Sequence, residues 1–269
     1  MHFVMKPDMV YQFPIWAVGL VFVGLAVLGA IVVELGARRF LPLHLRREHH
    51  DVAAAMLSII GVTYAVLLAF VAMLAWEGYN KAKAASYKEA ALVLDVYNAS
   101  VGFTDPQMSL MRDDIIGYLK EVVNVEWPAQ AEGRTVGRGA AYLHRLNGIA
   151  TGLNPHNLAD GNLHALLLQS LRQLTDARQE RLLAATTDFP TIVWIVLLLG
   201  GGLTIAFGSF FGSPSLLMHL AMSAILTISG ALVVVLIIAL SNPFRGDFRV
   251  STDPFDQVLA QIEASTIRP

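Results

Sequence analysis

Four long apolar segments constrain the fold of this chain more than any other feature. They cover about residues 14–35, 52–76, 190–211 and 215–240. Each is long enough to cross a bilayer, which takes about 20 apolar residues in a helix. Only 15% of the 269 residues are charged, whereas a soluble domain carries about 25%. The sequence therefore predicts an all-α protein of a cell (plasma or inner) membrane, with four transmembrane helices and both termini on the same side.

The predicted spans are paired at the two ends of the chain. Residues 1–76 form an N-terminal transmembrane hairpin, and residues 190–240 form a C-terminal one closed by a tight turn at 212–214. Residues 77–189 are more polar, and their pattern predicts a helical region outside the membrane. No stop signal follows Trp76, so the second span is predicted to continue as one long helix to about Ser100.

The central region predicts several further helices. Gly102 and Pro106 end the long helix, and the next helix is closed by Trp127, Pro128 and the glycine-rich stretch "AEGRTVGRG" at residues 131–139. A short helix at about residues 140–150 precedes a leucine-rich helix that runs towards Pro190. One face of the helix after Pro106 is predicted to be apolar, through Met111, Ile115, Tyr118, Leu119 and Val122. Its acidic residues are predicted to lie on a solvated face, namely Asp113, Asp114, Glu121 and Glu126.

Composition and motifs argue against several classes of function. The formal net charge is −2 at pH 7, so a nucleic-acid partner is not expected. The chain has no cysteine, which excludes thiol catalysis and cysteine-bound metal centres. No nucleophile–base pair or nucleotide motif is visible, so we expect neither an enzyme nor a cofactor. The cluster His44, His49, His50 and Asp51 is interpreted as a charged loop at the membrane surface rather than a metal site.

The distribution of arginine and lysine leaves the orientation in the membrane open. Four arginines in the link after the first span favour a cytoplasmic position for that link. More basic residues lie on the opposite side, but many belong to the long central region. Because long loops contribute little to the positive-inside rule, neither orientation is favoured.

The spans lack ionisable residues near their centres. Glu34, Glu77 and His219 lie towards the ends of their spans or just outside them. A proton-coupled transporter, pump or voltage sensor needs a charge that titrates or moves within the membrane. A channel does not, because a pore can be lined by hydroxyls and apolar rings that gate by dewetting.

The second and third spans carry residues at four-residue spacing. Val62, Val66 and Phe70 recur every four residues in the second span. Read alone, such a stripe indicates ordinary core or lipid-facing packing. In the third span Gly200, Thr204, Gly208 and Gly212 follow the same spacing, which is typical of close packing between helices.

The segment after the fourth span is predicted to fold back as a C-terminal clasp, residues 241–269. Pro243 ends the span, and Phe244 and Phe248 can pack against exposed helices. Asp253 and Pro254 begin a short amphipathic helix. Its apolar face consists of Phe255, Val258, Leu259 and Ile262. The face must be buried somewhere, either on the central region of the same subunit or on a neighbouring subunit.

Two stretches resemble bestrophins. "AFVAMLAWEGYNKA" is similar to the second transmembrane helix of bestrophins, whose apolar, pore-lining part leads into a Trp-x-x-Tyr ending, here Trp76 and Tyr79. "NPFRGDF" is similar to the segment after their last span, with matches at Asn242, Pro243 and Phe244. Nearly the full length resembles the bestrophin-like family of largely bacterial membrane proteins, through "REHHDV", "YAVLLAFV", "DARQERLLAA" and "PFRGDFRVSTDPF".

The resemblance implies a pore. Bestrophins are homopentameric anion channels in which five second helices form a narrow apolar neck. When the two sequences are matched at the Trp-x-x-Tyr ending, the resemblance implies that the neck positions of bestrophins correspond to Ser58, Val62, Val66 and Phe70. Two of the three apolar positions are valine, whereas bestrophin necks are richer in aromatic rings. The calcium-binding acidic run of eukaryotic bestrophins is interrupted here by arginines and is not expected to bind metal.

The sequence thus favours a bestrophin-like, homo-oligomeric ion channel for small anions. Its expected partners are further copies of itself, a pentamer being implied by the resemblance, together with membrane lipids and small inorganic anions. The alternative is a non-conducting, membrane-anchored scaffold or sensor whose helical region binds a partner. A channel requires the second span around a symmetry axis, whereas a scaffold can be a monomer or dimer.

Overall fold

A computed structural model describes residues 11, 13–40, 50–103, 106–186, 189–211 and 215–267, and every regular element within these ranges is helical. Most of the loop that contains His44 and His49 lies outside them. Among the described residues, four helices are long and apolar enough to cross a membrane, which confirms the predicted four-span, all-α fold. They are α1 (Ile15–Phe40), α3 (His50–Ser100), α8 (Thr191–Gly208) and α9 (Leu216–Ser241).

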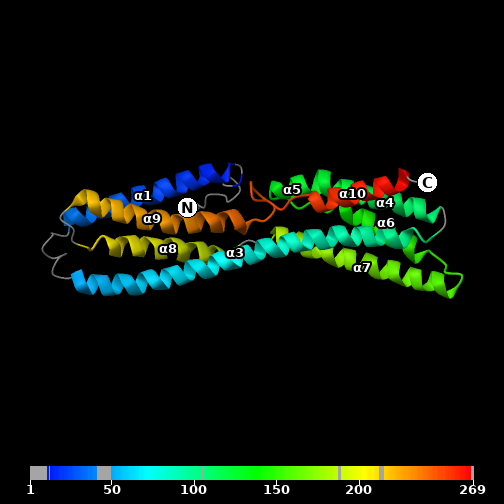
Figure 1. The fold of residues 1–269 in the computed structure, drawn as a ribbon, viewed down its shortest axis with the longest axis horizontal. Coiled ribbons are helices and arrows are strands. Elements are labelled where there is room, and N and C mark those ends of the chain that lie inside the picture. Colours follow the sequence, from blue (N-terminus) through cyan, green and yellow to red (C-terminus); the bar gives the residue numbers. More distant parts are fainter. Residues whose placement is uncertain are drawn as a thin grey trace, which may run out of the picture. The chain divides into compact units, whose positions relative to one another are not determined.

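The chain forms two compact units (Figure 1). Unit 1 comprises Met1–Glu77 and Asp188–Ser241, and unit 2 comprises Gly78–Thr187 and Asn242–Pro269. Helix α3 belongs to both, because its 51 residues continue without a break past Trp76. Alanine, lysine and glutamate beyond Trp76 are good helix formers, so nothing in the sequence stops the helix at the end of the span.

Unit 1 is a bundle of α1, the first part of α3, α8 and α9. Helix α1 packs most closely against α9, and α8 contacts both (Figure 1). The Tyr11 hydroxyl lies 3.1 Å from Ser241 Oγ, so the start of α1 and the end of α9 lie at the same end of the bundle. Further along α1, buried Glu34 places Oε2 2.9 Å from His219 Nε2 and accepts a hydrogen bond from Arg38 Nε.

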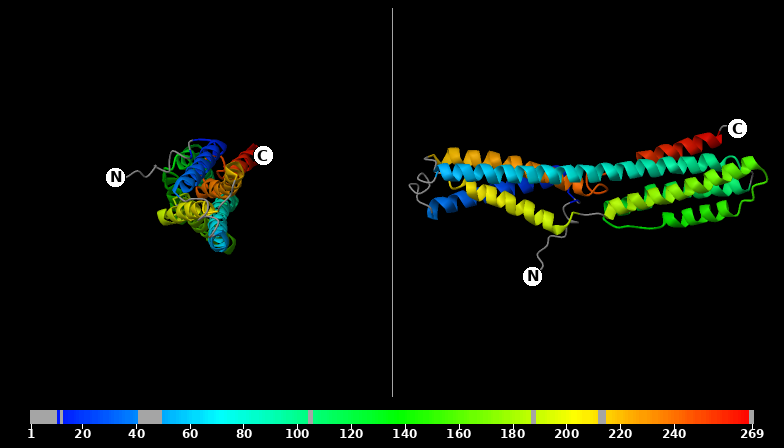
Figure 2. Two further views of the ribbon diagram at one scale, coloured as in Figure 1. Left: turned by 90° about the vertical axis from the view of Figure 1, so that its left-hand side faces the viewer. Right: turned by 90° about the horizontal axis from the view of Figure 1, so that it is seen from below.

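Unit 2 combines the second part of α3 with shorter helices from the central region and the C-terminus. They are α4 (Gln107–Glu121), η2 (Val122–Glu126), α5 (Trp127–Ala131), α6 (Gly139–Thr151), α7 (Leu158–Thr186) and α10 (Asp253–Ile267). The predicted apolar face of α4 is confirmed, since all five of its residues are buried in the core of this unit. Helix α10 lies beside α3 (Figure 2), where the Tyr97 hydroxyl is 2.8 Å from Ser265 Oγ.

Of the two signals expected to close the helix, Trp127-Pro128 does not end it, whereas the glycine-rich stretch does. The chain passes through one π-helical turn, η2, in which the Trp127 N–H donates to the Val122 carbonyl five residues earlier. Pro128 has no N–H, and its ring would collide with the carbonyl four residues back in a regular α-helix. A π turn widens the helix at this point. The helix therefore continues to Ala131 and ends before Gly133, whose φ is 75°.

The C-terminal clasp is part of unit 2, where its apolar side chains join the core formed by the central helices of the same chain. Phe244 is 2% exposed, and α10 buries Phe255, Val258 and Ile262. The expectation that Phe248 also packs back is wrong, because its side chain is 57% exposed. Between the two phenylalanines the chain turns at Gly246, which has a φ of 72°, so the second ring points away from the core.

Candidate pore-lining face of α3

Four residues of α3 form an exposed stripe in unit 1, called here the α3 stripe: Ser58, Val62, Val66 and Phe70. The three apolar side chains are 65%, 50% and 63% exposed. The Ser58 hydroxyl donates to the Ala54 carbonyl at 2.9 Å, so its proton is already used within the helix. Residues four apart in a helix lie on one face, and no described part of the chain covers this face.

The opposite face of the same helix packs into the bundle. Leu68, Val71 and Ala75 are buried, at the alternating spacing of three and four residues that keeps side chains on one side. Helix α3 therefore has a packed side and an open side over its membrane-spanning part. The open side must contact lipid, water or another protein chain.

The Trp-x-x-Tyr ending lies where α3 passes from unit 1 to unit 2. Trp76 is 56% exposed. Tyr79 is half-buried and packs against the hydrophobic core of unit 2. Within the α3 stripe, Ser58 is the one polar residue, and the other three side chains are apolar.

Behind the stripe, the Tyr64 ring lies against two glycines of α8. A Cβ atom at Gly200 would lie 2.6 Å from Tyr64 Cδ2, and one at Gly201 would lie 2.9 Å from the Tyr64 hydroxyl oxygen. A Cβ at Gly208 would meet nothing within 4 Å, and Gly212 lies outside the described residues. The four-residue spacing in α8 therefore reflects room for an aromatic ring at Gly200, and no comparable contact exists at Gly208.

A matched pair of substitutions tests this contact. Gly200→Ala is expected to lower stability by about 1–3 kcal/mol, the usual cost of overpacking a well-packed site. Gly202→Ala is expected to leave stability unchanged or slightly higher, because a Cβ there meets nothing within 4 Å. Thermal unfolding midpoints of the two variants in detergent provide the comparison. Equal midpoints would show that the Tyr64 ring yields without cost.

A buried cluster of charges joins three elements of unit 2. Glu89 of α3 accepts hydrogen bonds from Arg181 Nε at 2.6 Å and from the Tyr118 hydroxyl at 2.5 Å. Glu126 of η2 accepts from Arg181 Nη2 at 2.9 Å and from Arg178 Nη2 at 2.6 Å. Two carboxylates thus share two guanidinium groups, and all four side chains are 0–5% exposed.

The expected solvated position of Glu126 is wrong. It lies four residues after Val122 and continues the buried face of α4, where it also accepts a hydrogen bond from the Gly139 N–H at 2.9 Å. Asp114 is also less exposed than expected, since its side chain is 15% exposed and paired with Arg145. The arginines that bind Glu126, Arg178 and Arg181, lie in "DARQERLLAA". Nothing in that stretch indicated that these two charged side chains would be buried.

Glu126 and Arg181 keep their charges. Burial alone would raise the pKa of Glu126, but hydrogen bonds and charge from Arg178, with the charge of Arg181, hold that pKa below its usual value. Burial likewise lowers the pKa of a guanidinium, yet Glu89 and Glu126 raise the pKa of Arg181 above its usual value. Burial and the neighbouring Glu89 raise the pKa of Tyr118 well above its usual range, so its hydroxyl remains a donor.

Trp127 connects this cluster to the C-terminal clasp. Its ring lies 5.3 Å from the Arg181 guanidinium carbon, a cation–π distance. Its Nε1 donates to the Val250 carbonyl at 3.0 Å. The rings of Phe244 and Phe255 meet it edge-on at 5.3 Å and 5.4 Å. The Asn242-Pro243-Phe244 segment is thereby fixed on unit 2, where the Pro243 carbonyl also accepts from the Val250 N–H at 2.7 Å.

The acidic residues of the clasp do not converge. Asp253 accepts a hydrogen bond from the Ser251 hydroxyl at 2.8 Å. In the part of the chain that the structure describes, no group of three or more histidine, aspartate or glutamate side chains is arranged to hold a metal ion. Asp247, Asp253 and Asp256 of the clasp therefore do not belong to such a group.

These features define a helical membrane protein in which one long helix exposes an apolar face and a buried ionic cluster joins helices of unit 2. A family model for the bestrophin-like domain matches residues 22–255. The chain belongs to the bestrophin-like family.

Solved structures share this fold. A point variant of a bacterial bestrophin homolog from Klebsiella pneumoniae aligns with a TM-score of 0.69 and 11% identity, over 93% of this chain and 99% of that one. Another structure of a bestrophin homolog from Klebsiella pneumoniae aligns with a TM-score of 0.68 and 12% identity, over 92% and 98%. A variant described as a membrane protein aligns with a TM-score of 0.65 and 14% identity, over 93% and 99%. No curated protein matches the chain in sequence.

Proposed function

We propose that this protein is a homo-oligomeric ion channel that passes small anions through a neck formed by the α3 stripe. The observation that carries the proposal is the exposed, four-residue-spaced line Val62, Val66 and Phe70 on a helix whose other face is packed. A pentamer follows from the resemblance to bestrophins. Copies of α3 around a symmetry axis would cover the stripe, which a single chain leaves open.

The chemistry of the stripe suits a gated neck. A ring of valine and phenylalanine side chains excludes water when it is narrow and conducts when it widens. The edges of an aromatic ring carry partial positive charge, so Phe70 edges directed at the axis would tolerate anions. Trp76 and Tyr79 would anchor the helix just beyond the neck, since aromatic residues favour the membrane interface.

The four apolar helices suit a channel that spans a cell membrane. The contact between Tyr11 and Ser241 at one end of unit 1 supports an arrangement with both termini on the same side. We propose the plasma or inner membrane as the location. A channel needs no catalytic group, and the buried Glu89, Glu126, Arg178 and Arg181 are engaged with one another, so we do not propose an enzyme.

Halide flux into liposomes tests the proposal. The Val66→Ala/Phe70→Ala double variant is expected to raise flux severalfold over the wild type, because smaller side chains widen the neck. A matched control is Val21→Ala/Leu25→Ala on α1, whose side chains are both 63% exposed outside the stripe. The control is expected to conduct like the wild type.

Other outcomes of this experiment have definite meanings. Unchanged or lower flux in a folded Val66→Ala/Phe70→Ala variant would remove the neck from the α3 stripe. Flux of sodium rather than halide would reverse the proposed charge selectivity. No flux from any folded variant would favour the alternative of a membrane-anchored scaffold or sensor, and the search for a partner would turn to unit 2.

A further inference from the structure

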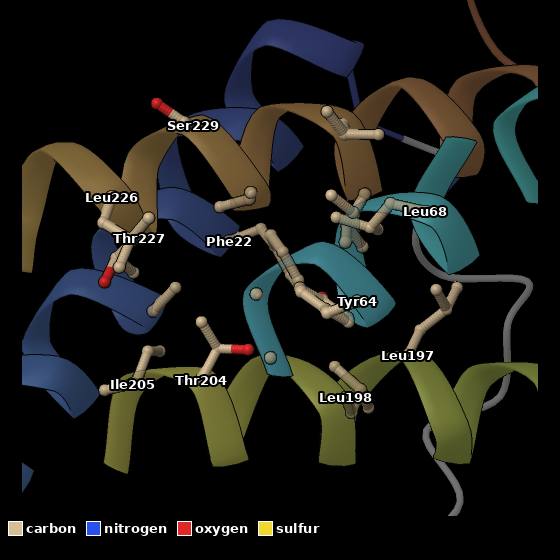
Figure 3. A pocket seen from close by; sticks show the side chains of 18 of the residues that line it. Phe22, Tyr64, Leu68, Leu197, Leu198, Thr204, Ile205, Leu226, Thr227 and Ser229 are labelled. Atoms are coloured by element: carbon tan, nitrogen blue, oxygen red, sulfur yellow. The ribbon is translucent and has the colours of Figure 1, made fainter. Parts of the chain in front are cut away.

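Unit 1 contains an apolar cavity of about 420 Å³ among α1, α3, α8 and α9. Figure 3 shows side chains from these helices around it, including Phe22 of α1, Tyr64 of α3 and Leu197 of α8. Pockets that bind small molecules measure about 300–1,000 Å³, so the space is large enough for a ligand. The cavity lies behind the α3 stripe, on the packed side of the same helix.

Most hydroxyl protons of the cavity wall are already used in hydrogen bonds. The hydroxyls of Thr204, Thr227 and Ser229 donate to carbonyl oxygens of their own helices at 2.8, 2.8 and 2.9 Å. Only the Tyr64 hydroxyl makes no hydrogen bond to another described residue. It lies over Gly201, whose backbone leaves room for it.

Water is a poor occupant of such a space. A buried water needs about two to four polar partners, and the side chains of the wall offer only the hydroxyl oxygens of Tyr64, Thr204, Thr227 and Ser229, which are spread over three helices among apolar side chains. An empty cavity is also unfavourable, because the side chains around a void lose their dispersion contacts. The largely apolar wall therefore favours an apolar occupant that is large enough to contact several of the helices.

The position of the cavity indicates where that occupant comes from. All four surrounding helices are candidate membrane spans, so the medium around them is the hydrocarbon of the bilayer. The cavity is partly open to the surface of unit 1, and two residues that line it, Leu198 and Leu226, are 57% and 48% exposed. A hydrocarbon chain can enter there without leaving the membrane.

We propose that this cavity binds the acyl chain of a membrane lipid. Phe22 and Tyr64 supply aromatic walls, and leucine, alanine and glycine supply the remainder. The site is distinct from the α3 stripe, and the proposal does not depend on ion conduction. Its ligand is the hydrocarbon chain, whatever headgroup the lipid carries.

Two glycines allow the cavity to be filled by mutation. Gly61 and Gly230 line it, and a Cβ atom at either would meet nothing within 4 Å. Gly61→Leu and Gly230→Leu would therefore place a side chain in the cavity without a collision at Cβ. Gly24→Leu is the matched control, because Gly24 is exposed on α1, has no neighbour within 4 Å of a Cβ and does not line the cavity.

Photolabelling tests the proposal directly. The protein is reconstituted in phosphatidylcholine whose acyl chain carries a diazirine near its middle, irradiated, and mapped by mass spectrometry. The wild type and Gly24→Leu are expected to carry label at Tyr64. Gly230→Leu and Gly61→Leu are expected to lose most of it, at least severalfold, while labelling of the outer face of α1 is retained.

Two results would overturn the proposal. One is a wild-type map without label at Tyr64 or elsewhere on the cavity wall. The other is undiminished labelling of Tyr64 in correctly assembled Gly230→Leu and Gly61→Leu. If either leucine variant misassembles, the proposal is judged on the wild type alone. Label at Tyr64 must then decrease when excess lipid without diazirine is added, and label that does not decrease would also overturn the proposal. Because the readout is covalent labelling, a protein that conducts no ions gives the same answer.

Discussion

Arg181→Ala is expected to destabilise unit 2 by about 3–5 kcal/mol, the usual cost of breaking a buried ion pair from one side. The Arg181 side chain is 0% exposed and bridges Glu89 and Glu126 through Nε and Nη2. Its removal would leave Glu89 buried without a positive partner. The Tyr118 hydroxyl, which donates to Glu89 at 2.5 Å, cannot replace a charge. Reduced thermal unfolding midpoints and faster proteolysis of unit 2 are the expected results.

A surface ion pair provides the matched control. Arg145→Ala removes a partner of Asp114, but the Arg145 side chain is 50% exposed, and exposed ion pairs contribute little. Its unfolding midpoint is therefore expected to stay close to that of the wild type. Arg181→Lys should fall between the two, since lysine keeps the charge but cannot bridge two carboxylates with a planar fork. If Arg181→Ala proved no less stable than Arg145→Ala, the ionic cluster would not organise unit 2.

Phe244→Ala is expected to have the second large effect. The ring is 2% exposed and meets Trp127 edge-on at 5.3 Å. Truncating a buried phenylalanine costs about 3–5 kcal/mol through lost transfer energy and the cavity left behind. The loss should loosen the clasp, so α10 is expected to become sensitive to protease before the rest of unit 2.

Phe248 offers a control within the same turn. Its ring is 57% exposed, so Phe248→Ala should change neither the unfolding midpoint nor the cleavage pattern. Both variants remove the same side chain, and only its burial differs. Equal resistance of Phe244→Ala and Phe248→Ala to protease would show that the clasp is held by α10 alone.

Local periodicity predicted much of this fold. Apolar length identified the four spans, and the three-and-four spacing of Met111, Ile115 and Val122 identified the buried face of α4. The same spacing extends to Glu126, but a carboxylate there suggested solvent. The partners that make its burial possible, Arg178 and Arg181, lie on α7. A pairing between distant helices leaves no trace in the pattern of either helix.

The proposed neck and the cavity behind it also differ in how far the sequence could predict them. The four-residue spacing of Val62, Val66 and Phe70 belongs to one helix, so it could be recognised from the sequence. The seat of Tyr64 on Gly200 and Gly201 depends on how α3 meets α8. The four-residue spacing of Gly200, Thr204 and Gly208 indicated only close packing between helices, and the structure was needed to identify the residue that approaches Gly200.

The absence of cysteine from the chain permits the most direct test of the proposed neck. Val66→Cys places a single thiol on the α3 stripe, and Leu25→Cys places one on α1 at a position 63% exposed in the wild type. Each variant is reconstituted in liposomes and treated with a charged, thiol-specific reagent, and labelling is verified by mass. If the stripe forms the neck, labelling should abolish halide flux through Val66→Cys and leave flux through Leu25→Cys and the wild type unchanged. Undiminished flux through fully labelled Val66→Cys would contradict a pore lined by α3.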